Sequence, residues 1–530
     1  MLLRAHCSKK VIMHRSAHLA FVVVSTIAWT GCGRSTALHV PDAAPSASFR
    51  VPVASPVRLL DMVFMIDNSS MAPKVQKMNA QFPKLIAALQ DPNDNNSLPD
   101  LRIAIIDSDL GTGNAYANGT CGPKTSADGT ASSYGDLGRF QMPNAKTCGV
   151  STPDAKWLEY TKGKPVNFTG DINTVFTCLT GGLGSLGCGE EHQLQAFEFA
   201  LVAGGLGNDE QHAMLRRNAH LALIFITDED DCSAAMNDGM FGVKTELQGE
   251  SASLRCATRA HQCSGQNLTT APPGYPTTAS FSAPLSACAA RTDSCPNATD
   301  GDPNGTDTSV STSCSPLKNI KHLAEEIKAL KDDPESQVFV AGIFGWPLTE
   351  EDMANATYTI GQVPNPNIAD TAHPTVFDLW PVCYDPSHKP ASSTQFDSSA
   401  AGWGATPGLR LSAFVDEFGK NGLKASICQS DFSVTMSQIG SKLAQQLSTR
   451  CLPESYAQYS SCAAHYLIPD SAGGYTRQAD DVPSCDASPS VPGCYTLVPD
   501  GAPCAPGELL VQTESSSAMP PGTMLEFSCK

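Results

Sequence analysis

Two long apolar runs in this chain each end in an aspartate. The run MVFMI leads directly into Asp67, and the run LALIFIT leads into Asp228. Continuous apolar runs of this kind are typical of buried strands in a parallel sheet, and such sheets bind their ligands at the carboxyl ends of the strands. The sequence therefore predicts an α/β protein with an acidic site at one edge of its sheet.

Strand-like and helix-like segments alternate from residue 58 onward, which predicts a doubly wound, mostly parallel sheet with helices on both faces. In the common strand order 3-2-1-4-5-6, the first and fourth strands are neighbours, so Asp67 and Asp228 would meet at one crevice. Strands are expected at 59–66, 101–106, 221–226 and 338–344, and helices near 75–89, 194–202, 317–330, 411–418 and 436–447.

Composition divides the chain into four parts. Long polar stretches interrupt the α/β pattern, and six cysteines among Pro, Gly and Ser residues follow it, which favours a small β module held by disulfides. The expected parts are an export signal at 1–31, an Ala/Pro/Ser tether at 32–57, the α/β domain at 58–450 with insertions near 109–175, 232–314 and 347–408, and a Cys-rich module at 451–530.

The first 31 residues are typical of an export signal. Four basic residues precede an apolar run at 17–27 that is too short to span a bilayer. The run ends in Trp29-Thr30-Gly31-Cys32, which resembles the bacterial lipoprotein cleavage box, although that box usually has leucine where this chain has Trp29. The resemblance implies a lipid on Cys32, a membrane anchor and, because Gly33 follows, the outer membrane of the cell envelope. Plain secretion is the alternative.

Cysteine usage also favours export. The chain has 20 cysteines, and setting aside Cys7 and Cys32 leaves an even number between Cys121 and Cys529. No C-x-x-C pair is present, so an oxidising compartment and about nine disulfides are expected rather than zinc sites, with pairing that the sequence does not reveal.

The chain is acidic, with a formal charge of −18 that becomes −22 once the four basic residues of the export signal are removed. An acidic surface repels phosphates, which argues against nucleic acid and anionic lipid as partners and is compatible with divalent cations.

The segments LLDMVFMIDNSSM and LIFITDEDD resemble the von Willebrand factor type A (vWA) domain. GCGEE at 187–191 and FGKNGLKASICQSDFS at 418–433 are similar to a subgroup found in predicted lipoproteins of the myxobacterial type. The resemblance covers roughly 58–450 and implies a metal-ion-dependent adhesion site, where a D-x-S-x-S loop, a threonine and a fourth-strand aspartate hold one cation. It assigns Asp67, Ser69 and Asp228 as ligands, with a carboxylate of the partner completing the coordination.

The chain departs from this pattern at two points. Met71 stands at the third loop position, and a thioether is a poor ligand for hard cations, so Ser70 is the candidate substitute. No threonine clearly fills the second-loop position, and Glu191, or less favourably Glu190, is expected to supply an oxygen there. An additional carboxylate favours Ca²⁺ over Mg²⁺. The predicted ligand set is therefore Asp67, Ser69, Ser70, Glu191 and Asp228.

Other interpretations remain open. The acidic residues 229–231 that follow Asp228 favour a solvated loop after the strand; a stronger negative field at the metal or a second calcium site is the alternative. GLGSLG at 182–187 matches a dinucleotide-binding pattern, but Glu190 and Glu191 would repel a pyrophosphate. No H-E-x-x-H or G-x-S-x-G motif is present, so no enzymatic activity is predicted. The expected function is cation-assisted binding of a protein or other acidic ligand; a structural envelope protein with a degenerate site is the alternative.

Overall fold

The computed structural model divides the chain into two units, Met1–Ser46 and Ala47–Lys530. Cys32, the expected lipidation site, and Ser70, an expected metal ligand, lie outside the residues that it describes. The described residues are 47–52, 58–69, 71–91, 96–111, 124–125, 131–132, 135–152, 154–184, 187–202, 213–234, 252–268, 282–295, 314–347, 358–364, 375–390, 396–448, 451–470, 474–486, 494–499, 507–513 and 523–530.

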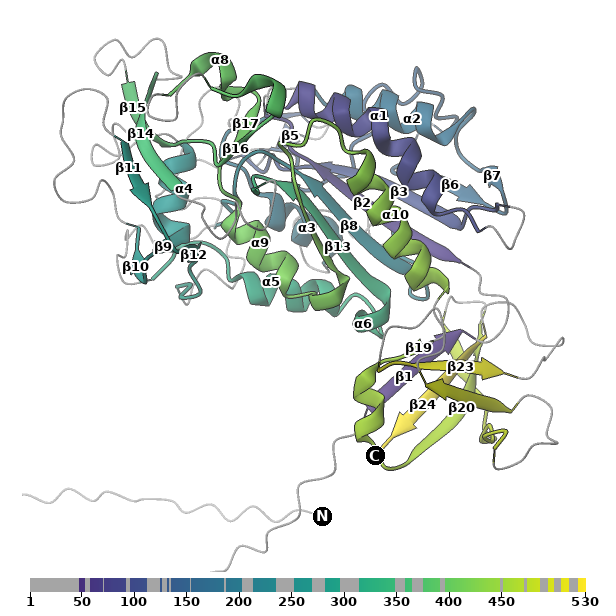
Figure 1. Ribbon diagram of the computed structural model, residues 1–530. Helices are drawn as coiled ribbons and strands as arrows, with labels where there is room; N and C mark the ends of the chain where they lie inside the picture. The colour runs from purple at the N-terminus through teal and green to yellow at the C-terminus, as the bar shows by residue number, and fades with distance from the viewer. Residues whose placement is uncertain are drawn as a thin grey trace, which may run out of the picture. The chain divides into compact units, whose positions relative to one another are not determined.

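A seven-stranded, mostly parallel sheet forms the centre of the second unit (Figure 1). Four of its five parallel strands confirm those expected at 59–66, 101–106, 221–226 and 338–344, the fifth at 422–426 was not predicted, and two short antiparallel strands complete one edge. Along the sheet the strands are β18 (Gly422–Ser426), β13 (Val338–Phe344), β8 (His220–Ile226), β2 (Leu59–Ile66), β3 (Asp100–Asp107), β6 (Leu158–Thr161) and β7 (Lys164–Pro165).

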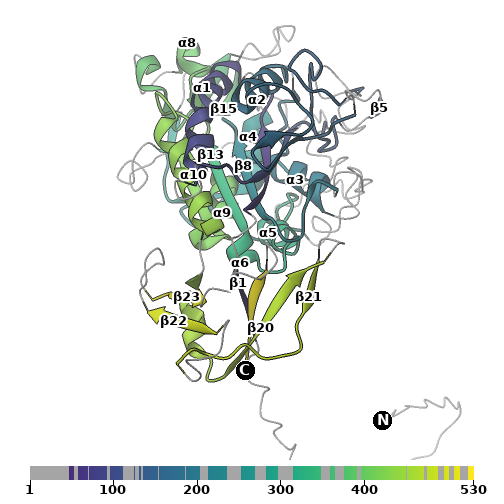
Figure 2. The same ribbon diagram turned by 90° about the vertical axis from the view of Figure 1, so that its right-hand side faces the viewer.

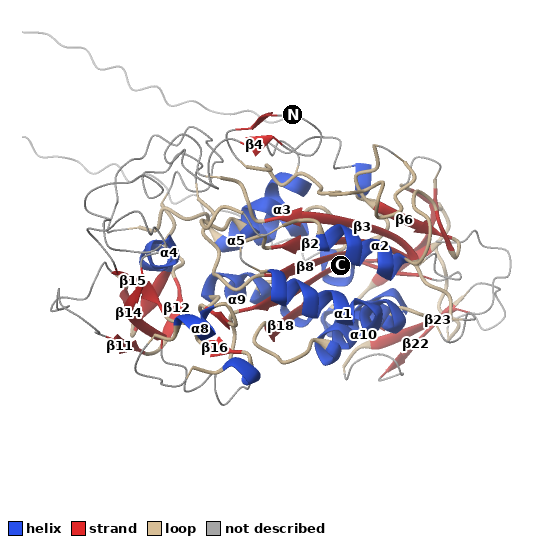
Figure 3. Cartoon of the chain, turned by 90° about the horizontal axis from the view of Figure 1, so that it is seen from above, coloured by secondary structure: helices blue, strands red, loops and turns tan. Residues whose placement is uncertain are grey.

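Each central strand is apolar on both sides because helices cover both faces of the sheet. On β2, Met62 and Phe64 pack into one core, whereas Val63 and Met65 pack into the other. Figure 3 shows the strands between α1 and α10 on one side and α3 and α5 on the other. The first core takes its helical residues from α1 (Ala72–Ala88), α2 (Ile172–Gly181) and α10 (Ser433–Ser448), and the second from α3 (Gln193–Leu201), α5 (Ile320–Lys328) and α9 (Leu409–Asp416).

The polar excursions contain short elements of their own. Their helices are α4 (Ala252–Ala260), α8 (Ser398–Ala401) and η6 (Pro386–His388), while α6 (Pro334–Gln337) and η7 (Gly419–Asn421) flank β13 and β18. Their strands are β4 (Lys124–Thr125), β5 (Ala131–Ser132), β9 (His261–Cys263), β10 (Gln266–Asn267), β11 (Ser282–Leu285), β12 (Cys288–Ala290), β14 (Tyr358–Pro364), β15 (Thr375–Leu379), β16 (Cys383–Tyr384) and β17 (Gly404–Ala405).

Disulfides connect many of these short elements. Cys188 and Cys451 are also disulfide-bonded. Among the described residues the paired cysteines are Cys148–Cys178, Cys232–Cys256, Cys263–Cys288, Cys295–Cys314, Cys383–Cys428, Cys462–Cys529 and Cys485–Cys494.

The last part of the chain forms two small sheets (Figure 2). One has the order β1-β24-β20-β21 and the other β19-β23-β22. The bounds are β1 (Ala47–Pro52), β19 (Cys451–Leu452), η8 (Glu454–Gln458), β20 (Cys462–Pro469), β21 (Tyr475–Arg477), β22 (Tyr495–Pro499), β23 (Leu509–Thr513) and β24 (Met524–Cys529).

Strand β1 corrects the expectation that residues 32–57 form only a tether. Residues 47–52 pair antiparallel with β24 from Ala47↔Cys529 to Pro52↔Met524. Phe49 packs edge-on against Tyr456, with ring centroids 5.6 Å apart, and Val51 is buried. The alternation in this strand is short, and its partner is the last strand of the chain, so local sequence gives little sign of it.

Within the described residues, no helix combines the length and the apolar character needed to cross a membrane.

Candidate functional site

The two strand-final aspartates leave the sheet at the same edge, because β2 and β8 are parallel neighbours in which Ile66 pairs with Ile226. The Asp67 backbone N–H donates to the Ile226 carbonyl at 3.0 Å, which fixes the start of the loop that follows β2. The Ser69 N–H then donates to Asp67 Oδ1 at 2.7 Å. Asp67 has no exposed surface, so its carboxylate is held beneath this loop.

Thr227 holds the other oxygen of Asp67. Its hydroxyl donates to Asp67 Oδ2 at 2.7 Å and accepts a hydrogen bond from Gln193 Nε2 at 3.0 Å. Sequence reasoning missed Thr227 as part of the site. The only signal was a hydroxyl residue at the end of the most apolar run of the chain, directly before Asp228.

Glu191 lies near enough to Asp67 for the charges of the two carboxylates to interact. Glu191 is only 1% exposed; its Oε2 accepts a hydrogen bond from the Ser108 hydroxyl, and the Ser69 side chain also interacts with its carboxylate. The turn that carries Glu191 packs closely on the loop after Asp67, because Gly187 N–H donates to the Asn68 carbonyl at 3.0 Å. A Cβ at Gly187 would lie 2.0 Å from Asn68 Oδ1, so this approach requires glycine.

Asp67, Glu191 and Glu229 form a cluster of carboxylates. Burial and the nearby Asp228 charge raise the pKa of Asp67 to about 7. Burial, with the charges of Asp67 and Glu229, raises the pKa of Glu191 well above its usual value. None of the three forms an ion pair with a Lys or Arg among the described residues. A divalent cation is one way to offset such a cluster, and the oxygens of Asp67, Ser69 and Glu191 are donors that Ca²⁺ and Mg²⁺ accept.

Asp228 has a different partner from the one expected. Its carboxylate pairs with the ammonium group of Lys74, a buried residue in the first turn of α1 that also donates to the Gly404 carbonyl at 2.6 Å. A carboxylate held by a buried ammonium group is poorly placed to bind a second cation. The aspartates therefore meet at one edge as expected, and Asp228 is held there by Lys74.

Met71 is a core residue. Its side chain is fully buried among the residues on the α1 side of the sheet, and the residue itself precedes the first turn of α1. The departure from the serine of the vWA pattern therefore replaces a ligand position with an apolar contact. Among the residues of this loop that the structure describes, Ser69 is the one with a hydroxyl group.

The expectation of a solvated acidic loop at 229–231 is wrong for Asp230 and Asp231. Asp230 accepts hydrogen bonds from the backbone N–H groups of Arg410 at 3.0 Å and Leu411 at 3.2 Å, at the start of α9, and it contacts His261 Nε2 at 2.6 Å. Asp231 is fully buried, accepts from the Leu194 N–H at 2.9 Å at the start of α3 and from Arg410 Nε at 3.0 Å. These carboxylates fasten helices to the sheet edge, so they do not form a second calcium site.

Glu190 lies outside the cluster. It pairs with Arg255 at 3.3 Å and lies beside the sulfurs of Cys232 and Cys256. Burial raises the pKa of Glu190 to about 7 against the opposing effect of two arginines. Three potential metal-ligand atoms gather here, but the two sulfurs form a disulfide and are not thiolates. With its two cysteines joined in a disulfide, the group formed by Glu190, Cys232 and Cys256 is therefore not a metal centre.

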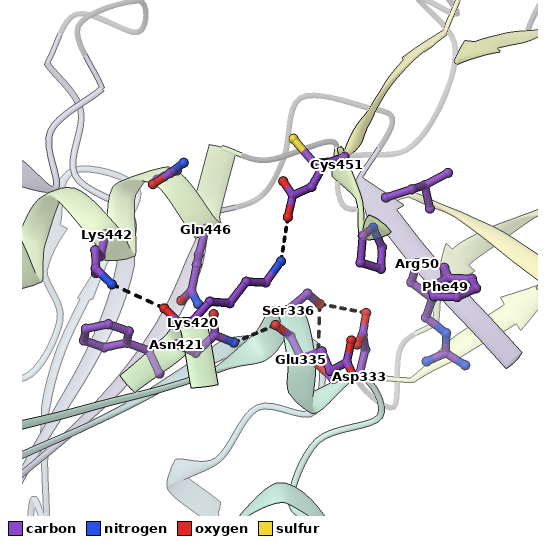
Figure 4. Close-up of a pocket in the computed structure, with 15 residues that line it drawn as sticks. Phe49, Arg50, Asp333, Glu335, Ser336, Lys420, Asn421, Lys442, Gln446 and Cys451 are labelled. Carbon is purple, nitrogen blue, oxygen red and sulfur yellow. Dashed lines mark hydrogen bonds and ion pairs between the residues drawn. The ribbon is translucent and has the colours of Figure 1, made fainter. Parts of the chain in front are cut away.

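A pocket of about 250 Å³ lies near the amino end of β13, where Phe339 is one of its walls (Figure 4). Lys420 and Glu508 form an ion pair at 2.6 Å within it, and Lys442 donates to the Lys420 carbonyl at 3.3 Å. None of the candidate cation ligands lines this pocket. It is therefore separate from the carboxylate cluster at the opposite ends of the strands.

Comparisons with known proteins give no relative that assigns a function. No protein-family model matches the chain, and no curated protein matches its sequence. Among solved structures, the pilus adhesin SpaC from Lactobacillus rhamnosus GG in its open conformation is 8% identical at a TM-score of 0.26, over 91% of this chain and 40% of the adhesin. The human COPII-coat protein Sec24c is 9% identical at a TM-score of 0.26, over 91% of this chain and 42% of that protein. This chain thus spans less than half of either protein, and similarities this weak support no inference.

Replacing Arg410 by methionine tests the supporting network. The change leaves the buried Asp231 without its guanidinium partner, and we expect the free energy of unfolding to fall by about 3–5 kcal/mol. Arg217→Met is the control, because Arg217 is 65% exposed and its pair with Asp332 should contribute only about 0–1 kcal/mol. Urea denaturation measures both. Equal losses in the two variants would contradict the structural role of the Arg410–Asp231 pair.

Proposed function

We propose that this chain is an exported cell-envelope protein whose α/β domain is vWA-like and doubly wound, and which uses a divalent cation at Asp67, Ser69 and Glu191 to bind an acidic group of a protein or other ligand. The observation that carries the proposal is that Asp67 and Glu191 are buried beside each other and, among the residues that the structure describes, neither pairs with a Lys or Arg. Burying unpaired carboxylates costs free energy, and a bound cation offsets that cost.

The arrangement of the strands supports the vWA assignment. The loop carrying Asp67 and Ser69 joins the strand at the centre of the sheet to helix α1, and the neighbouring strand ends in Thr227 and Asp228. These positions correspond to the first loop and the fourth-strand aspartate in the vWA resemblance. Glu191 arrives from a third segment, where that family has a threonine.

The donor set favours Ca²⁺ over Mg²⁺. Two buried carboxylates with a third nearby supply more oxygens than the strict octahedron of Mg²⁺ usually takes from protein, whereas Ca²⁺ accepts six to eight oxygens in looser geometry. The cation would supply a positive centre for an incoming carboxylate, and the chain's own residues would fix its position. The function is binding rather than catalysis.

A second candidate function is that of a structural envelope protein without cation-dependent binding. Two observations favour it: Asp67 and Glu191 are almost completely buried, and Lys74 already neutralises Asp228. Cation binding distinguishes the two candidates directly.

Calorimetric titration of the purified protein, starting at Ala47, tests the cation site. We expect heat on addition of Ca²⁺ and a weaker response to Mg²⁺, and we expect Asp67→Asn and Glu191→Gln each to lower the affinity at least tenfold, because each removes a charged ligand oxygen. Glu325→Gln, at an exposed position on α5, is the matched control and should bind like the wild type.

The variant Asp228→Asn tests whether Asp228 binds the cation directly or only stabilises the residues that do. Because Lys74 holds Asp228, we expect this variant to lose stability but to keep Ca²⁺ affinity far better than Asp67→Asn does. Absence of heat with the wild-type protein would exclude the cation site and leave the structural function.

The anchor is tested at Cys32. If the lipoprotein signal is used, the wild-type chain expressed in a bacterium with the lipoprotein pathway should incorporate labelled palmitate and enter the membrane fraction. Cys32→Ala should lose both properties, whereas Cys7→Ala, within the signal, should keep them. Equal labelling of wild type and Cys32→Ala would exclude lipidation at Cys32.

A further inference from the structure

Glu229 lies beside the proposed cation site, where its charge interacts with those of Asp67 and Glu191. Its N–H donates to the Thr227 hydroxyl at 3.2 Å, and the same hydroxyl donates to Asp67 Oδ2 at 2.7 Å. A single hydroxyl group thus links the Glu229 backbone to the carboxylate of Asp67. Glu229 remains partly exposed, whereas Asp67 and Glu191 are 0% and 1% exposed.

The backbone around Glu229 is fixed on both sides. The Thr406 N–H donates to the Asp228 carbonyl at 2.9 Å, and the Asp230 carboxylate accepts from the start of α9. The Glu229 side chain therefore has little freedom to leave through movement of its own backbone. A hydrogen bond from the Ser253 side chain on α4 also holds its carboxylate.

The carboxylate of Glu229 is surrounded by other acids. Asp228, Asp67 and Asp378 are the charged groups that act on it most strongly, and they raise its pKa together with burial. The like charges of Asp67 and Glu191 disfavour the ionised form of a carboxylate beside them. Its retention beside Asp67 and Glu191 is understandable if a cation lies between them.

We propose that Glu229 is itself a ligand of the cation and occupies the coordination position that an outside carboxylate needs. This inference rests on the proposed cation site and adds its regulation: the chain carries an internal competitor for its acidic partner. Binding then requires Glu229 to move away from the cation, and Ser253 on α4 stabilises the closed arrangement. An acidic partner that contacts the insertion carrying α4 would favour the open arrangement.

Luminescence of bound Eu³⁺, a hard cation close to Ca²⁺ in size, tests this competitor directly. Lifetimes measured in H₂O and in D₂O give the number of water molecules on the bound ion. We expect the wild-type protein to hold few waters, and Glu229→Ala to gain about one or two, because a carboxylate takes one or two coordination positions. Sodium acetate, as the simplest outside carboxylate, should remove these added waters in Glu229→Ala and leave the wild type unchanged.

Glu325→Ala is the control for loss of an exposed carboxylate and should match the wild type in hydration and in its response to acetate. If Glu229→Ala fails to fold, as judged by circular dichroism, Glu229→Gln is measured in its place, since it keeps the shape and removes the charge. In Glu229→Gln we expect acetate to reduce the number of water molecules on the bound Eu³⁺.

The outcomes separate the two levels of the proposal. Eu³⁺ bound by wild type with the same hydration in wild type and Glu229→Ala would overturn the role of Glu229 and leave the cation site standing. Failure of the wild type to bind Eu³⁺ would remove the cation site itself, and the internal competitor with it. If Glu229→Ala, but not the wild type, shows more water molecules on Eu³⁺ and loses them to acetate, both the cation site and the role of Glu229 are supported.

Discussion

A buried carboxylate needs hydrogen-bond donors or a cation to compensate its charge, and this requirement organises the edge of the sheet where β2 and β8 end. Asp228 has Lys74, and Asp231 has Arg410 and the start of α3. These pairs attach the surrounding helices to the sheet. Asp67 and Glu191 accept hydrogen bonds from neutral groups alone among the described residues, and that imbalance is the physical basis for a bound cation.

The insertions contribute to this edge. Cys232 begins one of them, is tied to Cys256 on α4, and donates its N–H to the Glu191 carbonyl at 2.7 Å. Cys188, on the same turn as Glu191, is also disulfide-bonded and donates its N–H to Asp109 Oδ2 at 3.1 Å. The turn that presents Glu191 therefore contains one disulfide-bonded cysteine and is hydrogen-bonded to a second. An exported protein forms such bonds in an oxidising compartment, which fits the proposed location.

Much of the sheet was predictable because its strands are apolar on both faces and its helices have regular apolar spacing. The meeting of Asp67 with Asp228 followed from strand order, and Glu191 followed from a resemblance at one motif. Lys74 was missed because a lysine in an amphipathic helix normally faces solvent. Thr227 was missed because it lies inside an apolar run. The roles of Asp230 and Asp231, like the pairing of β1 with β24, depend on partners that are distant in the chain, such as His261, 31 residues from Asp230, and Cys529, which pairs with Ala47; local patterns carry no information about such partners.

The most direct test of the central claim is an anomalous-difference map from crystals of the protein grown with Mn²⁺, which accepts the oxygen ligands of Ca²⁺ and Mg²⁺ sites. The account predicts one strong peak within coordination distance, about 2.0–2.6 Å, of carboxylate oxygens from both Asp67 and Glu191. A map with no peak at this edge would contradict it. A peak at Asp228, with the ion in the place of the Lys74 ammonium group, would also contradict it.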